Sequence, residues 1–245
     1  MLKKLLSNSG QVISKEQPIK VDFHSHLIPD IDDGVSTLDE SISIIRGFAK
    51  LGYKKIITTP HINAELFDNN PQIINNGLKD LKKAINEHVI DIEIAAAAEY
   101  YMDERFYEQV ENGEEFLTLH DQYILVETSM LNQPAFLLDV LFKLKSNGYQ
   151  PILAHPERYL YLQNNFDMVE KLKNQNILFQ VNINSIGLVY TRSSKDLIKK
   201  ILDHNYAEFI CSDCHHTRHF QEFRKNLAHF HKKYPDYVVH NNHLL

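Results

Sequence analysis

The chain has 245 residues, of which 43% are hydrophobic and 24% charged, and its formal net charge is −6. A mildly acidic chain lacks the broad basic surface of a nucleic-acid binder, so the composition does not favour a nucleic-acid partner, although it allows a local basic pocket. The apolar run after the N-terminal lysines is too short for a signal peptide, and no stretch approaches the roughly 20 apolar residues of a transmembrane helix. These features predict a cytoplasmic protein without a membrane-inserted segment.

Residues 1–19 are polar and weakly patterned, and we interpret them as an extension before a single domain of residues 20–245. Short β-rich runs then alternate with amphipathic helical patterns. Strands are predicted at 20–23, 55–59, 91–98, 123–126, 151–154, 177–181 and 208–211. Helices are predicted at 37–52, 71–88 and 103–112, from Pro134 onward, and at 166–174, 193–204 and 219–233.

The first predicted helix opens with a capping box, in which Thr37 and Glu40 would each satisfy a free backbone N–H group. The seven β/α alternations place the chain in the α/β class, with nearly apolar strands that are typical of a parallel sheet buried on both faces. Seven units in succession without a long linker favour a closed barrel, although an open sheet also fits the pattern.

Metal-competent side chains follow most of the predicted strands directly. His24 and His26 lie two residues apart, and the side chains of such a pair point to one face of a strand. The full set contains five histidines and four carboxylates: His24, His26, Asp33, His61, Glu99, Glu127, His155, Asp213 and His215. In parallel β/α barrels the carboxyl ends of the strands converge on one face, so we expect these side chains to meet there.

Mixed imidazole and carboxylate donors suit Mn, Fe or Zn better than a soft thiolate site would. Nine ligands are too many for one ion and fit two or three, and we infer that Glu99 bridges them, in the geometry of two-metal hydrolysis. The sequence therefore predicts a multinuclear metal site.

Six segments between residues 21 and 215 resemble the polymerase-and-histidinol-phosphatase (PHP) family of metallohydrolases. Within it, they are similar to the bacterial manganese-dependent tyrosine phosphatases of capsule and exopolysaccharide loci. The matching segments are Asp-Phe-His-Ser-His with Asp-Asp-Gly, Thr-Thr-Pro-His, Ala-Glu-Tyr-Tyr, Leu-Val-Glu-Thr-Ser, Ala-His-Pro-Glu-Arg-Tyr and Ser-Asp-Cys-His. The resemblance implies a distorted (β/α)7 TIM-like barrel, the PHP fold, and three divalent metal ions with Mn²⁺ favoured.

The resemblance also implies a role for each residue. One ion would bind His24, His26, Glu99 and Asp213; a second Glu99, Glu127 and His155; and the third Asp33, His61 and His215. Arg158 and Arg218 would bind phosphate, although only His216 and Thr217 separate Arg218 from the last histidine ligand, a shorter spacing than is usual in the family. Independently of the resemblance, Asp33 or a metal-bound water is a candidate proton donor to the leaving group.

These expectations together predict hydrolysis of phosphotyrosine on a protein of capsular or exopolysaccharide synthesis, such as the tail of a bacterial tyrosine kinase. Histidinol phosphate, a sugar phosphate or a nucleic-acid diester are alternative substrates for the same metals. A non-catalytic scaffold that only binds phosphotyrosine tails is an alternative of another class, and turnover distinguishes it from an enzyme.

Cys211 and Cys214 admit other interpretations. With His215 they match a c-type haem attachment pattern, and a Cys-x-x-Cys pair also occurs in redox and zinc sites. Packing of Cys211 in a strand and of Cys214 at the rim is the simplest interpretation. Neither cysteine has an arginine six positions later, so a cysteine phosphatase is excluded. Four tyrosines near the rim are candidates for a wall beside an aromatic substrate: Tyr100, Tyr101, Tyr159 and Tyr161.

Overall fold

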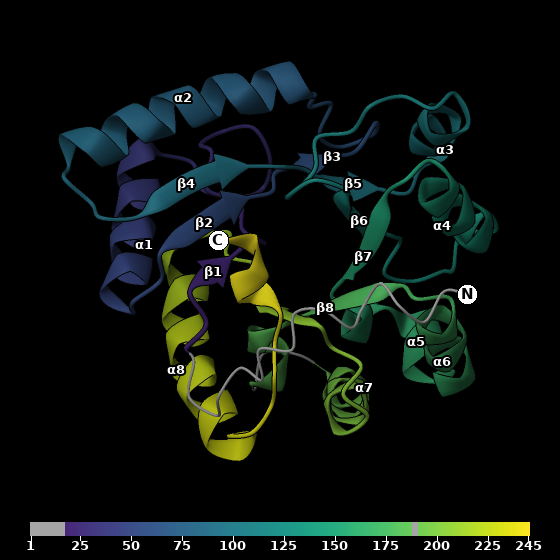
Figure 1. Ribbon diagram of the computed structural model, residues 1–245. Helices are drawn as coiled ribbons and strands as arrows, with labels where there is room; N and C mark the ends of the chain where they lie inside the picture. Colours follow the sequence, from purple (N-terminus) through teal and green to yellow (C-terminus); the bar gives the residue numbers. More distant parts are fainter. Residues whose placement is uncertain (1–17, 188–190) are drawn as a thin grey trace, which may run out of the picture.

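The computed structural model describes residues 18–187 and 191–245, so the predicted extension of residues 1–19 lies almost wholly outside the described residues. Parallel strands alternate with helices in one α/β domain (Figure 1). The strands are β1 (Val21–Asp22), β2 (Lys55–Thr58), β3 (His61–Ile62), β4 (Glu93–Ala96), β5 (Glu99–Tyr101), β6 (Tyr123–Glu127), β7 (Gln150–Ala154), β8 (Leu178–Asn182) and β9 (Phe209–Cys211).

The helices surround these strands (Figure 1). They are α1 (Leu38–Lys50), α2 (Pro71–Glu87), α3 (Glu104–Glu111), α4 (Leu137–Ser146), α5 (Leu160–Gln163), α6 (Phe166–Asn174), α7 (Arg192–Asp203) and α8 (Thr217–Lys233). Three 3-10 turns, η1 (Pro156–Arg158), η2 (Ile183–Ile186) and η3 (Asn241–Leu244), were not predicted, and neither was α5.

The start of α4 and the capping contacts of α1 differ from the sequence-based expectation. Pro134 does not open α4, because its carbonyl first accepts a hydrogen bond from Leu137 N in a turn, and the helix begins at Leu137. At α1, Thr37 Oγ1 accepts from Glu40 N as a cap should. The Glu40 carboxylate does not complete the capping box but accepts from Thr217 N at 2.8 Å, which ties the start of α1 to the start of α8.

The predicted closed barrel is not present as one closed sheet. The strands form a three-stranded sheet in the order β1-β2-β4 and a six-stranded sheet in the order β3-β5-β6-β7-β8-β9, and every pair is parallel. β2 ends at Thr58, one residue before the predicted end, and a further strand that was not predicted, β3, begins after Pro60, which has no N–H to donate. β4 likewise ends within the predicted third strand, and β5, which was not predicted, begins after residues 97–98.

Backbone contacts join the two sheets. After β1 and β9 the chains meet in a parallel bridge between Ser25 and Cys214, and Asp213 N donates to His24 O at 2.9 Å. The buried Asp22 carboxylate accepts from both the backbone N–H and the hydroxyl of Ser212, and burial raises the pKa of Asp22 to about 7. These contacts hold the carboxyl ends of β1 and β9 together, next to the candidate ligands that follow each strand.

The hydrophobic core has two parts. The larger cluster fills the space between strands and helices. A smaller cluster draws buried side chains from both sheets, including Phe23, Ile57, Leu125, Ile152 and Phe209. Strands buried on both faces explain why their sequences are nearly continuous apolar runs.

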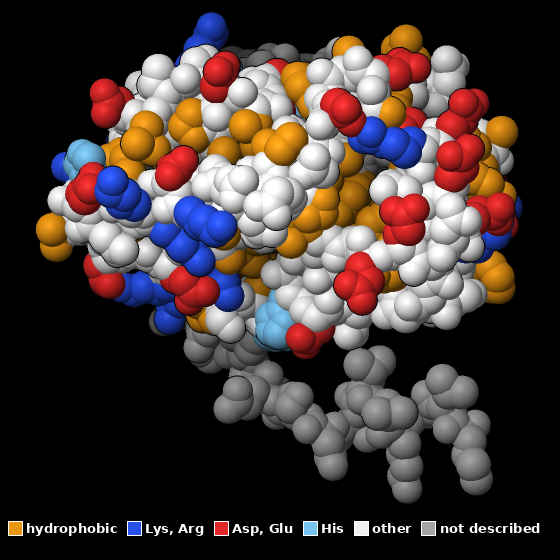
Figure 2. All heavy atoms as spheres, turned by 90° about the horizontal axis from the view of Figure 1, so that it is seen from above, with side chains coloured by type: hydrophobic (Ala, Val, Ile, Leu, Met, Phe, Trp, Pro, Cys, Tyr) orange, Lys and Arg blue, Asp and Glu red, His pale blue; other side chains and the backbone are white. Residues whose placement is uncertain are grey.

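The exposed surface carries charges of both signs. On the face seen from the side of α2, Lys and Arg side chains are interspersed with Asp and Glu, and hydrophobic side chains lie in a hollow between them (Figure 2). Within the described part of the chain, no helix is long and apolar enough to cross a membrane.

Candidate metal centre

All nine metal-competent side chains singled out from the sequence lie close together in overlapping groups. His61 and Glu99 are the first residues of the short strands β3 and β5, and they follow the carboxyl ends of β2 and β4. His61, Glu99 and Glu127 lie within β3, β5 and β6, while the remaining six follow β1, β7 or β9 in the chain. Parallel strands end on the same side, so a residue just past each strand points into one common space. Six of the nine are buried: His24, His26, Glu99, Glu127, His155 and Asp213.

Glu99 lies at the centre of the cluster and is fully buried. Its Oε2 atom is 3.0 Å from His24 Nε2, 3.3 Å from His61 Nδ1 and 3.5 Å from His26 Nε2. Its Oε1 atom is 3.0 Å from His155 Nε2. The two carboxylate oxygens therefore face different histidines, which is the arrangement that a bridging ligand requires.

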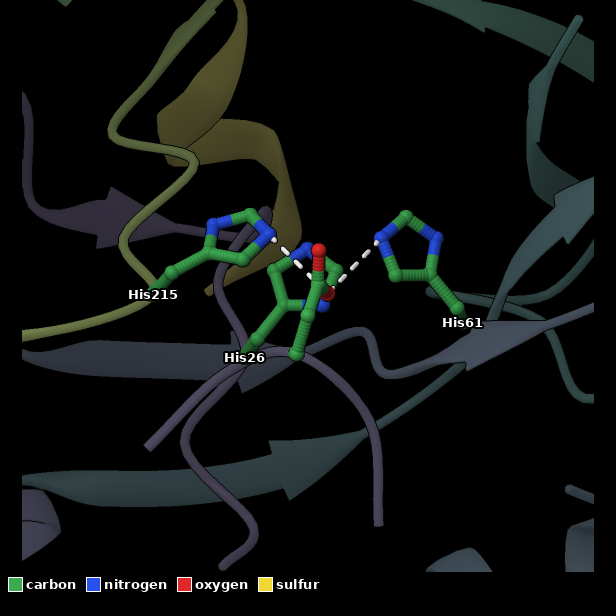
Figure 3. Close-up of side chains that lie close together, drawn as sticks. His26, His61 and His215 are labelled. Atoms are coloured by element: carbon green, nitrogen blue, oxygen red, sulfur yellow. Dashed lines mark ion pairs between the residues drawn. The ribbon is translucent and has the colours of Figure 1, made fainter. Parts of the chain in front are cut away.

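A second part of the cluster lies closer to solvent and is centred on Asp33. The Asp33 Oδ1 atom is 3.5 Å from His61 Nε2 and 3.5 Å from His215 Nε2. Figure 3 shows His61 and His215 pointing toward each other from either side of His26, with the two ion pairs dashed. The His26 and His215 rings stack, with their centroids 4.0 Å apart.

The candidate ligand atoms fall into four overlapping groups, in each of which the atoms lie within 4.8 Å of one another. His26 joins the predicted group of Asp33, His61 and His215. The other groups are His24, His26 and Asp213; His24, Glu99 and His155; and His61, Glu99 and Glu127. Glu127 is thus grouped with His61, whereas the resemblance paired it with His155, whose Nε2 is 3.8 Å from Glu127 Oε2.

The loop after His26 is folded tightly against that histidine. Asp32 Oδ1 accepts from Gly34 N at 3.0 Å, and Val35 N donates to His26 O. A Cβ atom on Gly34 would lie 2.4 Å from His26 O and 2.5 Å from His26 Cβ, so only glycine allows this approach. Gly34 is the glycine of the Asp-Asp-Gly segment, and this close approach is the steric reason for a glycine there.

Three side chains that the sequence did not single out hold the candidate ligands in place. His24 Nδ1 donates to Gln180 Oε1 at 2.7 Å, and His26 Nδ1 donates to Asp32 Oδ2 at 2.8 Å. Asn182 Nδ2 donates to Asp213 Oδ2 at 2.6 Å. Such partners fix which ring nitrogen faces a metal and how the ring is oriented. Gln180 and Asn182 alternate with apolar residues along β8, and this pattern was the signal available in the sequence.

Two of the candidate ligands have a left-handed backbone. His155, directly after β7, has φ 31°, and Asp213, two residues after β9, has φ 48°. This conformation is uncommon for residues other than glycine and is concentrated at functional sites, where surrounding structure holds it. The chain turns sharply at both positions as it leaves the sheet.

The carboxylates outweigh burial in setting the pKa values of the histidines. Burial alone would lower the pKa of His61, but the neighbouring Glu99 and Glu127 charges raise it to about 9. Burial likewise opposes protonation of His24 and His26, yet Glu99 and Asp213 raise the pKa of His24 and Asp32 raises that of His26. The cluster therefore attracts positive charge strongly.

The reciprocal effect acts on the carboxylates. Burial would raise the pKa values of Glu99 and Asp213, but the surrounding histidines hold both well below their usual range. A hydrogen bond with His215 is the largest cause of the lowered pKa of Asp33. All three are ionised at neutral pH, as metal ligation requires.

The chemistry of this cluster fits divalent metal ions. Two buried ring nitrogens of the cluster, His26 Nε2 and His61 Nδ1, have no hydrogen-bond partner. His61 Nδ1 is nevertheless 2.9 Å from Glu127 Oε1, and His26 Nε2 is 3.4 Å from Asp213 Oδ1. Nitrogen and oxygen donors that converge without hydrogen-bonding geometry are accounted for by a shared cation, and mixed imidazole and carboxylate donors suit Mn, Fe or Zn.

The two candidate arginines occupy different positions. Arg158, in η1, lines the pocket above the cluster and donates from Nη1 to Asp213 Oδ2 at 2.9 Å. Arg218 lies in the first turn of α8 with an exposed side chain and is not among the residues that line the pocket. Phosphate binding by Arg218 stays a prediction that this geometry does not support.

Both cysteines are buried free thiols. Cys211 packs in the smaller core cluster, and Cys214 packs in the larger one rather than lining the pocket. Burial raises the pKa of each thiol well above its usual range, which disfavours the thiolate that metal binding needs. Neither belongs to a group of candidate ligands among the described residues.

A pocket of about 270 Å³ opens above the cluster. Of the four candidate tyrosines, only Tyr101 lines it. The Tyr100 and Tyr159 hydroxyls accept hydrogen bonds from Leu117 N and Thr128 N, and the Tyr161 hydroxyl pairs with Thr128 Oγ1, so these three serve packing. The pocket also contains apolar residues that the sequence did not indicate, namely Leu66, Phe67 and Met130.

The fold and the site together define an α/β protein with parallel sheets and a candidate metal centre at the carboxyl ends of its strands. Residues 20–242 match the family described as "Capsular polysaccharide synthesis, CpsB/CapC". The chain belongs to the CpsB/CapC family.

The names of similar proteins agree with this assignment. The chain is 28% identical over 206 residues to "Tyrosine-protein phosphatase YwqE" of Bacillus subtilis (strain 168), covering 82% of this chain and 80% of that protein. It is 27% identical over 195 residues to "Putative tyrosine-protein phosphatase CapC" of Staphylococcus aureus, covering 80% and 76%. A solved structure from work on B. subtilis YwqE and Streptococcus pneumoniae CpsB, described as "unique metal-dependent tyrosine phosphatases", matches with a TM-score of 0.77 and 25% identity, covering 88% of this chain and 87% of that one.

Proposed function

We propose that this protein is a metal-dependent phosphomonoester hydrolase that removes phosphate from phosphotyrosine on a protein of capsular or exopolysaccharide synthesis. The observation that carries the proposal is the buried Glu99 carboxylate, whose two oxygens face four histidines at the base of an open pocket. Membership of the CpsB/CapC family and the relatives named as tyrosine-protein phosphatases support the reaction.

The metal centre in this proposal holds three divalent ions, with Mn²⁺ favoured and Fe or Zn as alternatives. Glu99 and the other eight predicted ligands would hold these ions, with Glu99 at the centre of the set. When bound, such ions supply a nucleophile from water near neutral pH and offset negative charge on the phosphoryl oxygens. The raised pKa values of the histidines and the lowered ones of the carboxylates support a site that favours cations.

Arg158 orients the phosphoryl group in this account. Its guanidinium lies at the edge of the pocket and pairs with Asp213, so one side of the fork is held against a candidate ligand. A planar fork binds phosphate oxygens with fixed geometry and offsets the charge that develops on them. We expect Arg158 to contribute to turnover more than to metal binding.

Asp33 lies at the mouth of the pocket, and more than half of its side chain is exposed. The lowered pKa of its carboxyl group supports a ligand more than a proton donor at neutral pH. A phenolate leaving group, whose conjugate acid has a pKa of about 10, needs less protonation than an alkoxide does. This chemistry favours an aryl phosphate as substrate.

Three further features remain predictions. The first is the distorted seven-stranded barrel, which the short breaks between strands and the core cluster shared by both sheets support. The second is the tyrosine-kinase tail as partner, and the third is the cytoplasmic location.

Initial rates of the Mn²⁺-loaded protein on a phosphotyrosine peptide, histidinol phosphate and a nucleic-acid diester distinguish the three predicted substrate classes. The proposal expects the peptide to be hydrolysed fastest. A higher kcat/KM on either of the other substrates would overturn the substrate assignment.

A further inference from the structure

The pocket above the candidate metal centre is chemically divided. Its base carries candidate ligands such as His61, Glu127 and His215, with Arg158 beside them. Leu66, Phe67, Tyr101 and Met130 also line it, and we call these four residues the apolar wall. A charged phosphoryl group accounts for the polar base, but it gives no reason for the apolar wall.

We propose that the apolar wall binds the phenyl ring of the phosphorylated side chain, and that Leu66 sets the preference for aryl over alkyl phosphates. This inference rests on the proposed function, since it places the substrate's phosphoryl group at the metal centre. Ligand pockets combine apolar surface with a few polar groups that fix orientation, and this pocket has both parts. Its volume of about 270 Å³ suits one side chain rather than a large ligand.

Leu66 is held in an exposed position by the loop that follows β3. Asn63 and Phe67 exchange two backbone hydrogen bonds of 3.0 Å, which close the loop. Asn63 Oδ1 accepts from Leu66 N and from Glu65 N inside it. Leu66 is 72% exposed, although it is a large apolar residue. The loop therefore presents Leu66 at the pocket with little conformational freedom to lose when a ligand binds.

Phe67 connects the apolar wall to the metal centre. Its ring stacks on the ring of His61, with centroids 5.5 Å apart and an interplanar angle of 15°. Asn69 Nδ2 donates to His61 O at 2.9 Å and fastens the other end of the same segment. A ring held on this wall is therefore positioned relative to a candidate ligand of the site.

Tyr101 supplies another part of the wall from β5. It lies two residues after Glu99, and alternate residues of a strand point to the same face. Two residues of a strand span roughly 7 Å, so Tyr101 lies that far beyond Glu99 toward the open end of the pocket. The wall thus begins just outside the polar base, where the ring of an aryl phosphate would lie.

The apolar wall should bind an aryl phosphate more tightly than an alkyl phosphate. A phenyl ring buries apolar surface against Leu66 and the aromatic rings, whereas the short carbon chain of phosphoserine has little surface to bury. The contacts are equally available before and during the reaction, so they strengthen binding without changing the chemical step. Losing part of an apolar pocket typically reduces discrimination about tenfold or more.

Binding of phenylphosphonate and methylphosphonate to the Mn²⁺-loaded protein, measured by calorimetry, tests the proposal without turnover. The native protein should bind phenylphosphonate more tightly, and Leu66→Ala should reduce the ratio of the two affinities about tenfold. Leu66→Met, which keeps the apolar volume, should retain the ratio. Leu131→Ala is the matched control, because Leu131 is 63% exposed on a nearby loop and does not line the pocket.

Kinetics on phenyl phosphate provides a second measurement. Leu66→Ala should raise KM with kcat nearly unchanged, because the lost contacts stabilise ground state and transition state alike. The proposal would be overturned if Leu66→Ala kept the native ratio of affinities, whether or not both phosphonates bound more weakly. It would also be overturned if the native protein bound the two phosphonates equally well. If no phosphomonoester is hydrolysed while the binding ratios behave as expected, the proposed function fails and the aryl-binding wall stands.

Discussion

Replacement of Gln180 by methionine should weaken metal binding, although Gln180 is not itself a candidate ligand. Its Oε1 atom accepts the hydrogen bond from His24 Nδ1 at 2.7 Å, which leaves His24 Nε2 directed at Glu99. Its Nε2 atom donates to Asn182 Oδ1 at 2.8 Å, and Asn182 holds Asp213. One amide side chain therefore orients two candidate ligands from behind.

The expected magnitude follows from these contacts. Loss of a partner that orients a metal ligand typically reduces metal affinity about 10- to 100-fold, or about 1.4–2.7 kcal/mol. Methionine is similar in length to glutamine but cannot accept the His24 hydrogen bond with comparable strength. The buried Nδ1 of His24 would also lose its partner in the metal-free protein, at a cost of about 1–3 kcal/mol of stability.

Calorimetric titration of chelator-stripped protein with Mn²⁺ measures the effect directly. Gln175→Met is the matched control, because Gln175 is exposed at the end of α6, on the surface. Circular dichroism of both variants checks that the fold is intact. Native Mn²⁺ affinity in a folded Gln180→Met variant would refute the reasoning that β8 supports the metal centre.

Three further predictions concern the pocket residue Arg158, the raised pKa of His61 and the buried thiol of Cys214. Arg158→Ala should lower turnover of a phosphotyrosine peptide about 10²- to 10³-fold with metal content retained, and full activity would exclude its role. In metal-free protein, His61 stabilises the fold fully below its unfolded pKa of about 6.5, and this stability is lost as pH rises through its folded pKa of about 9. The melting temperature of stripped protein should therefore fall over this range, corresponding to up to about 3 kcal/mol, and His61→Ala should reduce the slope; an unchanged slope would contradict the assignment. Cys214→Ala should lower stability by about 1 kcal/mol and leave metal content unchanged by elemental analysis, whereas loss of an ion would make the thiol a ligand.

The convergence of the candidate ligands could be predicted from the sequence, because each short apolar run marks a buried strand and the change to polar residues marks its end. A histidine or carboxylate follows every predicted strand except the one at 177–181, which Asn182 follows, and parallel strands bring such positions together. The split of the sheet was not predicted, since the breaks at Pro60 and at residues 97–98 are short and a further strand begins after each of them. Whether a curved parallel sheet stays continuous depends on tertiary contacts that a strand pattern does not contain.

The supporting residues were missed for a different reason. Gln180 and Asn182 are not metal-competent, and only their hydrogen bonds to His24 and Asp213 give them a role. Leu66 and Phe67 lie in a loop with no periodic pattern, so the apolar wall is visible only once the loop is folded. Four tyrosines were predicted near the pocket because they are close in sequence to candidate ligands, but only Tyr101 lines it.

Phosphate release from a phosphotyrosine peptide by chelator-stripped protein, before and after reloading with Mn²⁺, tests the central claim most directly. We expect no release from stripped protein, release after reloading, and none from reloaded His24→Ala, in which one nitrogen donor beside Glu99 is removed. Absence of release from native protein with confirmed Mn²⁺ uptake would contradict the phosphotyrosine substrate, and the alternative phosphoester substrates would then be favoured. Full release from stripped protein or from His24→Ala would contradict the metal centre itself.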